Sequence, residues 1–286
     1  MTAASTAVAE AVRQRARRFN RLHGGGRLLM LPNAWDAASA RLIADAGFPA
    51  VATTSAGIAY AAGYPDLGRM PWAEMLPRIA RIVASVAVPV SADIETGFGT
   101  SPEEVAATVR SVIEAGAVGC NIEDGTGDPR QPLFDSALVA ERIAAAREVA
   151  DACGLDFVIN GRTDGFLAGG CGAETLAEAI TRANRYLAAG ARCAFVPAVS
   201  DRDLITRLVA EIAGPVNLLV NADSPPLAEL QALGVARATT GGSLARAAFG
   251  FVRGALTELR ERGTFGYAVN ALTAAELDRL STSLDP

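Results

Sequence analysis

The segment "VPVSADIETGFGTSPEEVAATVRSVIEAGAVGCNIEDG", residues 88–125, contains one complete copy of the pattern that decides the fold. An apolar run ends in two carboxylates, Asp93 and Glu95, followed by a glycine turn. A helical stretch then begins with Ser101 as its capping residue and Pro102 in its first turn, positions at which both residue types are favoured. The next apolar run ends in "NIEDG". The segment therefore predicts a strand, a helix and a second, parallel strand.

The same pattern recurs along the whole chain. Between the apolar runs lie amphipathic stretches, such as residues 136–151, in which Val139, Ile143 and Ala146 form one apolar stripe with the helical period. Eight apolar runs end in polar residues or glycine: 27–35, 50–57, 88–95, 118–125, 156–164, 192–198, 216–222 and 235–241. Eight strand–helix units predict an α/β fold, a (β/α)8 TIM-type barrel, with an open doubly wound sheet as the alternative. We expect one domain over residues 1–286, with the barrel at about 25–260 and a C-terminal helical extension at about 262–286.

Composition excludes several classes of protein. The net charge is −5 with both signs dispersed, and the basic cluster at residues 13–21 is interpreted as a solvated helix face. The four cysteines are isolated, which excludes a CxxC zinc or redox site. The chain has no signal peptide pattern and no apolar run long enough to span a membrane. We therefore expect a cytoplasmic protein that binds neither nucleic acid nor membrane, with its only histidine, His23, on the surface.

Polar side chains gather where the predicted strands end, which is the edge that carries the active site in barrels of this kind. The candidates there are Asn33, Trp35, Asp36, Thr54, Ser55, Ala56, Gly57, Asp93, Glu95, Glu123, Asp124, Asn160, Arg162, Asp164 and Asn221. From these we take Thr54, Ser55, Ala56, Gly57, Trp35 and Asn221 as candidate substrate-binding residues.

Two carboxylates two positions apart on a strand share one face and repel each other unless a positive group lies between them. Asp93, Glu95 and the neighbouring Glu123 supply only oxygen ligands, a set that favours Mg²⁺, or Mn²⁺, over zinc. The alternative is that Asp93 and Glu95 form salt bridges to arginines across the barrel mouth.

Two further motifs carry open alternatives. Arg162 can hold a carboxylate bidentately and stabilise an enolate oxygen, or it can merely neutralise Asp164 or Glu123. The segment "TTGGSLAR", residues 239–246, is typical either of a phosphate site at a helix N-terminus or of close helix packing.

The segments "LPNAWDAASARLIADAGFPAVATTSAGIAYAAGYPD", "SADIETGFG", "NIEDG" and "NGRTDGF" resemble, in order and spacing, those of the isocitrate lyase/phosphoenolpyruvate mutase superfamily. The resemblance covers about residues 25–250. It implies a Mg²⁺ site with Asp93 as direct ligand, and with Glu95 and Glu123 acting through water. It also implies that Asp66 is an outer metal residue that joins Arg162 and Glu123 in the catalytic set.

The same resemblance implies the substrate and the assembly. Residues 55–57 would hold the carboxylate of a small-molecule substrate, and Arg162 would contact that substrate. The superfamily binds a 2-oxo acid or its enolate on the metal and makes or breaks a C–C or P–C bond. It also implies a homo-oligomer, a dimer or tetramer, formed by exchange of a C-terminal helix within residues 243–281.

One region departs from the pattern of the superfamily. Its lyases carry a Lys-x-Cys-Gly-His loop after the acid of the fourth strand, and its mutases carry a Lys and an Asn there. This chain reads "EDGTGDPRQPLFD" at residues 123–135. The nearby Cys120 precedes the motif, inside a predicted strand, and is interpreted as a core residue.

Three functions follow from the sequence. The first is a Mg²⁺-dependent carbon–carbon lyase or decarboxylase acting on a small 2-oxo or 2-hydroxy di- or tricarboxylate. The second is a P–C bond enzyme of the mutase or phosphonopyruvate hydrolase type. The third is a catalytically weak binder of 2-oxo acids.

Overall fold

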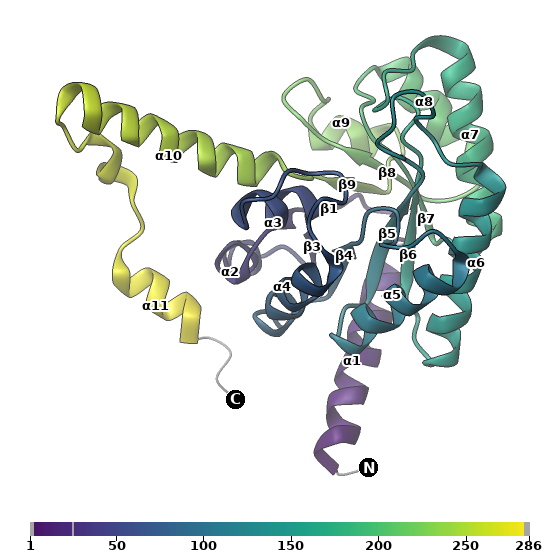
Figure 1. The fold of residues 1–286 in the computed structure, drawn as a ribbon, viewed down its shortest axis with the longest axis horizontal. Coiled ribbons are helices and arrows are strands. Elements are labelled where there is room, and N and C mark those ends of the chain that lie inside the picture. The colour runs from purple at the N-terminus through teal and green to yellow at the C-terminus, as the bar shows by residue number, and fades with distance from the viewer. Residues whose placement is uncertain (1–2, 25, 283–286) are drawn as a thin grey trace.

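A computed structural model describes residues 3–24 and 26–282. Its parallel strands lie in the order β1-β9-β8-β7-β6-β5-β4-β3-β2 and surround one axis (Figure 1). The strands are β1 (Leu29–Leu31), β2 (Asn33–Ala34), β3 (Val51–Thr53), β4 (Val90–Asp93), β5 (Gly119–Glu123), β6 (Val158–Arg162), β7 (Cys193–Val196), β8 (Val216–Leu219) and β9 (Arg237–Thr239).

The barrel closes within the first predicted strand, which Pro32 divides into β1 and β2. β1 pairs with β9, and β2 pairs with β3. Proline has no N–H to donate to the ladder, but the Pro32 carbonyl still accepts a hydrogen bond of 3.0 Å from the Ala52 N–H. Eight predicted strand segments thus yield nine strands, the (β/α)8 barrel is confirmed, and the open-sheet alternative is wrong.

Helices cover the outside of the barrel, because each crossover between parallel strands places a helix on the sheet. They are α2 (Ala37–Asp45), α3 (Ser55–Ala61), α4 (Trp72–Ala84), α5 (Pro102–Glu114), α6 (Ser136–Ala152), α7 (Gly172–Ala188), α8 (Arg202–Glu211) and α9 (Leu227–Ala232). The cap expected at Ser101 forms: its side chain accepts from the Glu104 N–H at 3.2 Å, and Glu104 accepts in return from the Ser101 N–H at 3.0 Å.

The first helix, α1 (Ala3–Leu22), lies at the amino-terminal end of the barrel. Its basic side chains Arg17 and Arg18 are exposed, but Phe19 is fully buried. A Cβ atom on Gly119 of β5 would lie 2.8 Å from the Phe19 ring, so the helix packs directly against the strand.

The prediction that His23 lies on the surface is wrong. The residue is only 4 % exposed, because the turn after α1 brings it under the barrel. Its Nδ1 lies 2.9 Å from the Phe19 carbonyl, and its Nε2 faces the Arg237 guanidinium at 3.4 Å.

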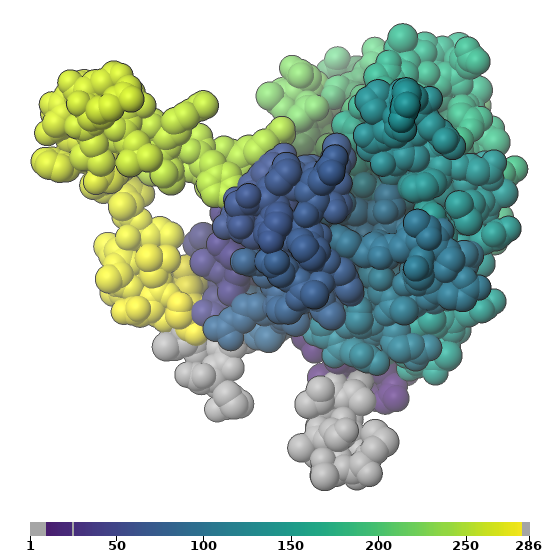
Figure 2. Space-filling model, in the orientation of Figure 1, coloured from purple at the N-terminus to yellow at the C-terminus, as the bar shows by residue number. Residues whose placement is uncertain are grey.

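The C-terminal part leaves the barrel. α10 (Ser243–Arg262) projects away from it, a 3₁₀ turn (Gly266–Asn270) follows, and α11 (Ala274–Thr282) returns beside α2. Figure 2 shows α10 as an arm with open space on both sides. An exposed ion pair of 2.9 Å between Arg279 and Asp45 joins α11 to α2. None of the helices that the structure describes is both long and apolar enough to cross a membrane.

Candidate active site

A cavity of about 220 Å³ opens at the carboxyl ends of the strands. It collects residues from most of the strand ends and from the first turn of α10. Its lining consists of Asn33, Thr54, Ser55, Ala56, Tyr60, Asp66, Leu67, Asp93, Asn121, Glu123, Arg162, Leu167, Phe195, Leu219, Arg237, Thr239, Gly241, Gly242 and Arg246.

Asp93 is the last residue of β4 and is almost fully buried. One of its oxygens accepts hydrogen bonds from the Ser55 N–H at 2.9 Å and the Ser55 hydroxyl at 2.8 Å. The other accepts from the Asn121 side-chain amide at 2.9 Å. These neutral donors hold the carboxylate in one orientation without neutralising it.

Glu95 reaches the same region from the turn after β4, and not from the strand that the sequence predicted. The strand ends at Asp93, and Glu95 adopts a left-handed backbone with φ 51°. Side chains larger than glycine seldom take this conformation, and where they do it is often at a functional site. The Glu95 carboxylate accepts a hydrogen bond from the Gly68 N–H, so the loop after α3 covers it.

Asp66 lies in that same covering loop. Burial, and then the charges of Asp93 and Asp66, raise the pKa of Glu95 to about 8. Burial also raises the pKa of Asp66, with a smaller contribution from Asp93. Among the described residues, none forms an ion pair with Asp66, Asp93 or Glu95. The structure therefore does not form the salt bridges to Asp93 and Glu95 that were the alternative to a metal.

Arg162 ends β6 and lines the same cavity as Asp66 and Asp93. Its Nη1 lies 2.6 Å from Glu123, and its Nε and Nη2 bind the two oxygens of Asp164 at 2.5 and 3.0 Å. Burial lowers the pKa of Arg162, but the charges of Glu123 and Asp164 outweigh burial and raise it above its ordinary value. Its guanidinium also lies 5.4 Å from the centre of the Phe195 ring. The arginine is thus both paired and fixed in position beside the cavity.

Hydrogen bonds to Asp124 fix the segment that follows Arg162. The fully buried Asp124 accepts a hydrogen bond of 2.7 Å from the Asp164 N–H. The Tyr186 hydroxyl also donates to Asp124 at 2.7 Å, and Arg182 lies 3.2 Å from it. Asp124 therefore points away from the cavity and ties the end of β6 to α7.

The predicted substrate-binding segment divides into two parts. Thr54, Ser55 and Ala56 line the cavity, and the Thr54 hydroxyl caps α3 by accepting from the Gly57 N–H at 3.2 Å. Gly57 and Trp35 are not part of the lining. A Cβ atom on Gly57 would lie 2.9 Å from the Trp35 Cβ, so this glycine permits close packing.

Asn221 also stands apart from the cavity. β8 ends at Leu219, and Asn221 is exposed in a turn where its side chain accepts from the Asp223 N–H at 2.8 Å. At the start of α10, the N–H groups of Thr240 and Gly241 both donate to the Asn33 side chain at 2.9 Å. These donors are therefore engaged by Asn33, which favours the packing interpretation of the "TTGGSLAR" segment.

Several lining residues were not selected from the sequence. Arg246 lies in the first turn of α10, at the mouth of the cavity, and Arg237 opens β9 with 1 % exposure. Tyr60, Leu67 and Leu167 come from α3 and from two loops. The signal that could have marked Arg246 as a site residue is its place in the sequence, just after the end of the last predicted strand. Nothing in the pattern distinguishes Arg237 from the first residue of an ordinary strand.

The loop at 125–133 is closed by its own hydrogen bonds. Gly125 and Leu133 form an isolated antiparallel bridge, and the Thr126 N–H donates to the Pro132 carbonyl at 2.9 Å. The chain contains no lysine at all. Cys120 is fully buried, and burial raises the pKa of its thiol to about 12, which agrees with a core role.

The donor set suits a hard divalent cation. Asp66, Asp93 and Glu123 of the lining, and Glu95 close to them, present only oxygen atoms. Of these four carboxylates only Glu123 forms an ion pair among the described residues, with Arg162. No three His, Cys, Asp or Glu side chains in the described ranges stand close enough to enclose a metal alone. Mg²⁺ commonly binds through one or two carboxylates and completes its shell with water and substrate, which matches this arrangement.

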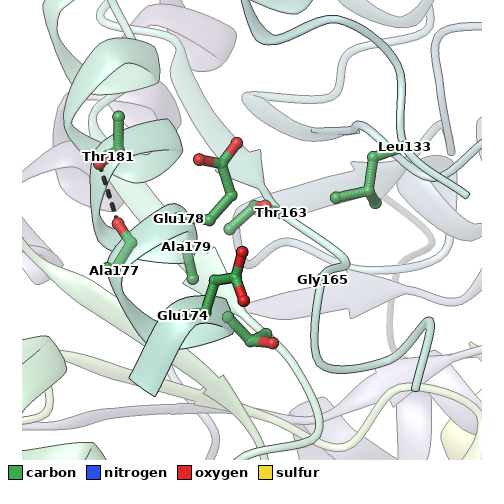
Figure 3. A pocket seen from close by; sticks show the side chains of 9 residues that line it. Leu133, Thr163, Gly165, Glu174, Ala177, Glu178, Ala179 and Thr181 are labelled. Carbon is green, nitrogen blue, oxygen red and sulfur yellow. Dashed lines mark hydrogen bonds between the residues drawn. The ribbon is translucent and has the colours of Figure 1, made fainter. Parts of the chain in front are cut away.

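A larger cavity, of about 520 Å³, lies between α7 and the segments around Thr163 and Leu133. Figure 3 shows the carboxylates of Glu174 and Glu178 beside it, while the Thr181 hydroxyl donates to the Ala177 carbonyl at 2.8 Å. None of the predicted site residues lines this cavity.

Comparison with known proteins places this geometry in a family. The family model for phosphoenolpyruvate phosphomutase matches residues 19–260. The chain is 32% identical over 252 residues to 2-methylisocitrate lyase of Halalkalibacterium halodurans, covering 86% of this chain and 77% of that one.

Two solved structures are also similar. A protein of Burkholderia cenocepacia J2315 described as a lyase/mutase is 40% identical, with a TM-score of 0.89 over 94% of this chain and 96% of that one. Phosphonopyruvate hydrolase in complex with oxalate and Mg²⁺ is 27% identical, with a TM-score of 0.80 over 93% of each chain. The chain therefore belongs to the phosphoenolpyruvate phosphomutase family and is an enzyme of the isocitrate lyase/PEP mutase superfamily.

Proposed function

We propose that this protein is a Mg²⁺-dependent carbon–carbon lyase or decarboxylase acting on a small 2-oxo or 2-hydroxy dicarboxylate. The observation that carries the proposal is the set of carboxylates without an ion pair beside a fixed arginine. Asp66 and Asp93 line the cavity with Glu95 close to both, and among the described residues none of the three forms an ion pair. Arg162 lines the same cavity and is fixed by Glu123 and Asp164. Such a site can hold a cation at the unpaired carboxylates and an anionic substrate that reaches both that cation and the arginine.

Each residue then has a distinct task. Asp93 would be the direct protein ligand of Mg²⁺, with Glu95, Glu123 and Asp66 acting through water. When bound, Mg²⁺ supplies a Lewis acid that polarises a substrate oxygen. Arg162 keeps N–H groups beyond those used by Glu123 and Asp164, and these can stabilise the negative charge of an enolate oxygen. Thr54, Ser55 and Ala56 shape the wall against which the substrate carboxylate lies.

The absence of a lysine from the chain and of a cysteine or histidine from residues 123–135 favours a reaction with modest need for proton transfer. In decarboxylation the electron pair of the breaking C–C bond passes to the 2-oxo group, and CO₂ leaves without a base. The enolate then takes a proton, which water can supply. Decarboxylation of a 2-oxo dicarboxylate therefore suits this loop better than a retro-aldol cleavage, which needs a base for the hydroxyl group.

A P–C bond enzyme is the second candidate, because phosphonopyruvate hydrolase shares the fold over 93% of each chain. Arg246 adds a further cation at the cavity mouth, with no ion-pair partner in the described part of the chain. A phosphonate or a second carboxylate can both use such a group.

The test starts with binding and then measures turnover. Calorimetry with Mg²⁺ and oxalate, a planar mimic of an enolate of pyruvate type, should show oxalate binding only when Mg²⁺ is present. Asp93→Ala should abolish this binding while the circular dichroism spectrum is unchanged, because Asp93 binds Ser55 and Asn121 rather than packing in the core. Glu211→Ala, which removes an exposed ion pair with Arg207 on α8, serves as control.

A screen of 2-oxo and 2-hydroxy dicarboxylates, with NMR of the products, then separates carbon–carbon cleavage from release of phosphate. Unchanged Mg²⁺-dependent oxalate binding in Asp93→Ala would disprove the metal assignment.

We also propose that the protein is a homo-oligomer in which α10 reaches a second subunit. Only Ala245 of this helix is buried. Five of its large apolar side chains are exposed: Leu244, Phe249, Phe251, Val252 and Leu256, at 40%, 41%, 58%, 52% and 60%. A long helix that projects from the barrel with such a surface is typical of an interface.

A further inference from the structure

A second chamber adjoins the active-site cavity on its outer side. It measures about 310 Å³ and is lined by Leu67, Glu123, Gly125, Gly127, Asp128, Pro129, Pro132, Asp164, Leu167 and Ala168. Leu67, Glu123 and Leu167 line both spaces. A substrate held near Asp93 and Arg162 can therefore extend past Glu123 into this outer chamber.

The charges of the outer chamber are one-sided. Its lining includes three carboxylates, on Glu123, Asp128 and Asp164, and none of the described residues in that lining is basic. All three carboxylates already have cationic partners: Arg162 for Glu123 and Asp164, and Arg130 for Asp128 at 3.2 Å. A negatively charged substituent would meet three like charges here and no free cation, an arrangement that rejects such a ligand.

The rest of the lining is apolar. Leu67 and Leu167 are 64% and 48% exposed, although large apolar side chains gain free energy when they are covered. Pro129, Pro132 and Ala168 add carbon surface on the loop side. An alkyl group placed here would cover both leucines and need no polar partner.

We propose that the outer chamber selects substrates whose substituent beyond the reacting carbons is an uncharged alkyl group, and that it rejects those with a carboxylate there. This inference rests on the proposed function, since it takes the metal and Arg162 to hold the carboxylate end of the substrate. The cationic groups Arg162, Arg237 and Arg246 all lie on the inner cavity, so they serve the carboxylates nearest the metal.

Two ligands of nearly equal shape test the proposal. Isocitrate is a malate with a carboxymethyl group on C3, and 3-isobutylmalate replaces that terminal carboxylate by an isopropyl group. Calorimetry with each ligand and Mg²⁺ should give a Kd for 3-isobutylmalate at least about tenfold lower than that for isocitrate. Equal affinity, or tighter binding of isocitrate, would overturn the inference.

A substitution in the chamber provides the second measurement. Leu167→Arg places a cation where the chamber has none, so the ratio of the two Kd values should shift at least about tenfold toward isocitrate. Leu227→Arg, at a leucine of similar exposure on α9 that lines neither space, should leave the ratio unchanged. An unchanged ratio in Leu167→Arg would count against the chamber as the selecting element.

Oxalate binding distinguishes failure of the specificity inference from failure of the proposed function. If oxalate with Mg²⁺ binds and only the preference between the two malates fails, the specificity inference alone is wrong. If oxalate does not bind with Mg²⁺ at all, the proposed function fails and the inference fails with it.

Discussion

Arg162 shows how one residue can satisfy two interpretations at once. It neutralises Glu123 and Asp164, as a structural arginine would, yet it also lines the cavity. Arg162→Lys keeps the charge but loses the planar fork that binds both oxygens of Asp164. We expect kcat/KM on the substrate found by the screen to fall at least about a hundredfold, or about 2.7 kcal/mol, while Mg²⁺ affinity hardly changes. Arg202→Lys, which loses an exposed two-pronged contact with Glu229 between α8 and α9, is the matched control. A silent Arg162→Lys would reduce Arg162 to charge balance.

At this scale the sequence was most informative where chemistry-bearing residues end a strand. Asp93, Glu123 and Arg162 each end a strand and line the cavity. The prediction failed to bring Asn221 to the cavity because β8 ends at Leu219 and the chain turns away, so the alternation of side chains along a strand no longer applies at position 221. The role of Asp93, Glu95, Glu123 and Asp66 toward a metal stays a prediction.

Among the elements, α1 differs most from its expected role, since His23 at its end is buried under the barrel. Burial, and then the charge of Arg237, lower the pKa of His23 to about 3. The pKa of histidine in the unfolded chain is about 6.5. Below that pH the unfolded chain binds a proton that the folded chain does not bind, so stability falls as pH drops from 6.5 toward 3.

His23→Gln should remove this contribution. Between pH 7 and pH 5, urea unfolding should show the wild type losing about 2 kcal/mol more than His23→Gln. Arg17→Gln, exposed on the same helix, should keep the wild-type pH dependence. If the free energy of unfolding of wild type and of His23→Gln changed with pH in parallel, His23 would not be held neutral.

Helix periodicity and caps predicted the outer helices, because those signals are local. The packing of α1 could not be read in the same way. Its cluster of arginines dominates the sequence. The residues that pack on the core, Val12, Ala16, Phe19 and Leu22, recur at steps of four and three, which is typical of any amphipathic helix. Which end of the barrel such a helix covers is a long-range property that depends on Gly119 of a strand a hundred residues later.

For the whole molecule, the count of eight units predicted the barrel, since eight parallel strands with their helices close on themselves. That a helix within residues 243–281 leaves its own barrel was expected only from the resemblance, because a helix that packs on its own barrel and one that packs on a partner carry similar apolar stripes. Phe249, Val252 and Leu256 recur at steps of three and four, so they form one face of α10. If that face lies against a second subunit, Val252→Asp with Leu256→Asp should convert the assembly to monomers of 29.4 kDa. Sedimentation velocity measures this change directly. Leu227→Asp, on α9, should leave the assembly intact.

Because Arg246 in the first turn of α10 lines the cavity, the dissociated variant should also bind oxalate with Mg²⁺ more weakly. A wild type that sediments as a monomer at micromolar concentration would contradict the proposed oligomer.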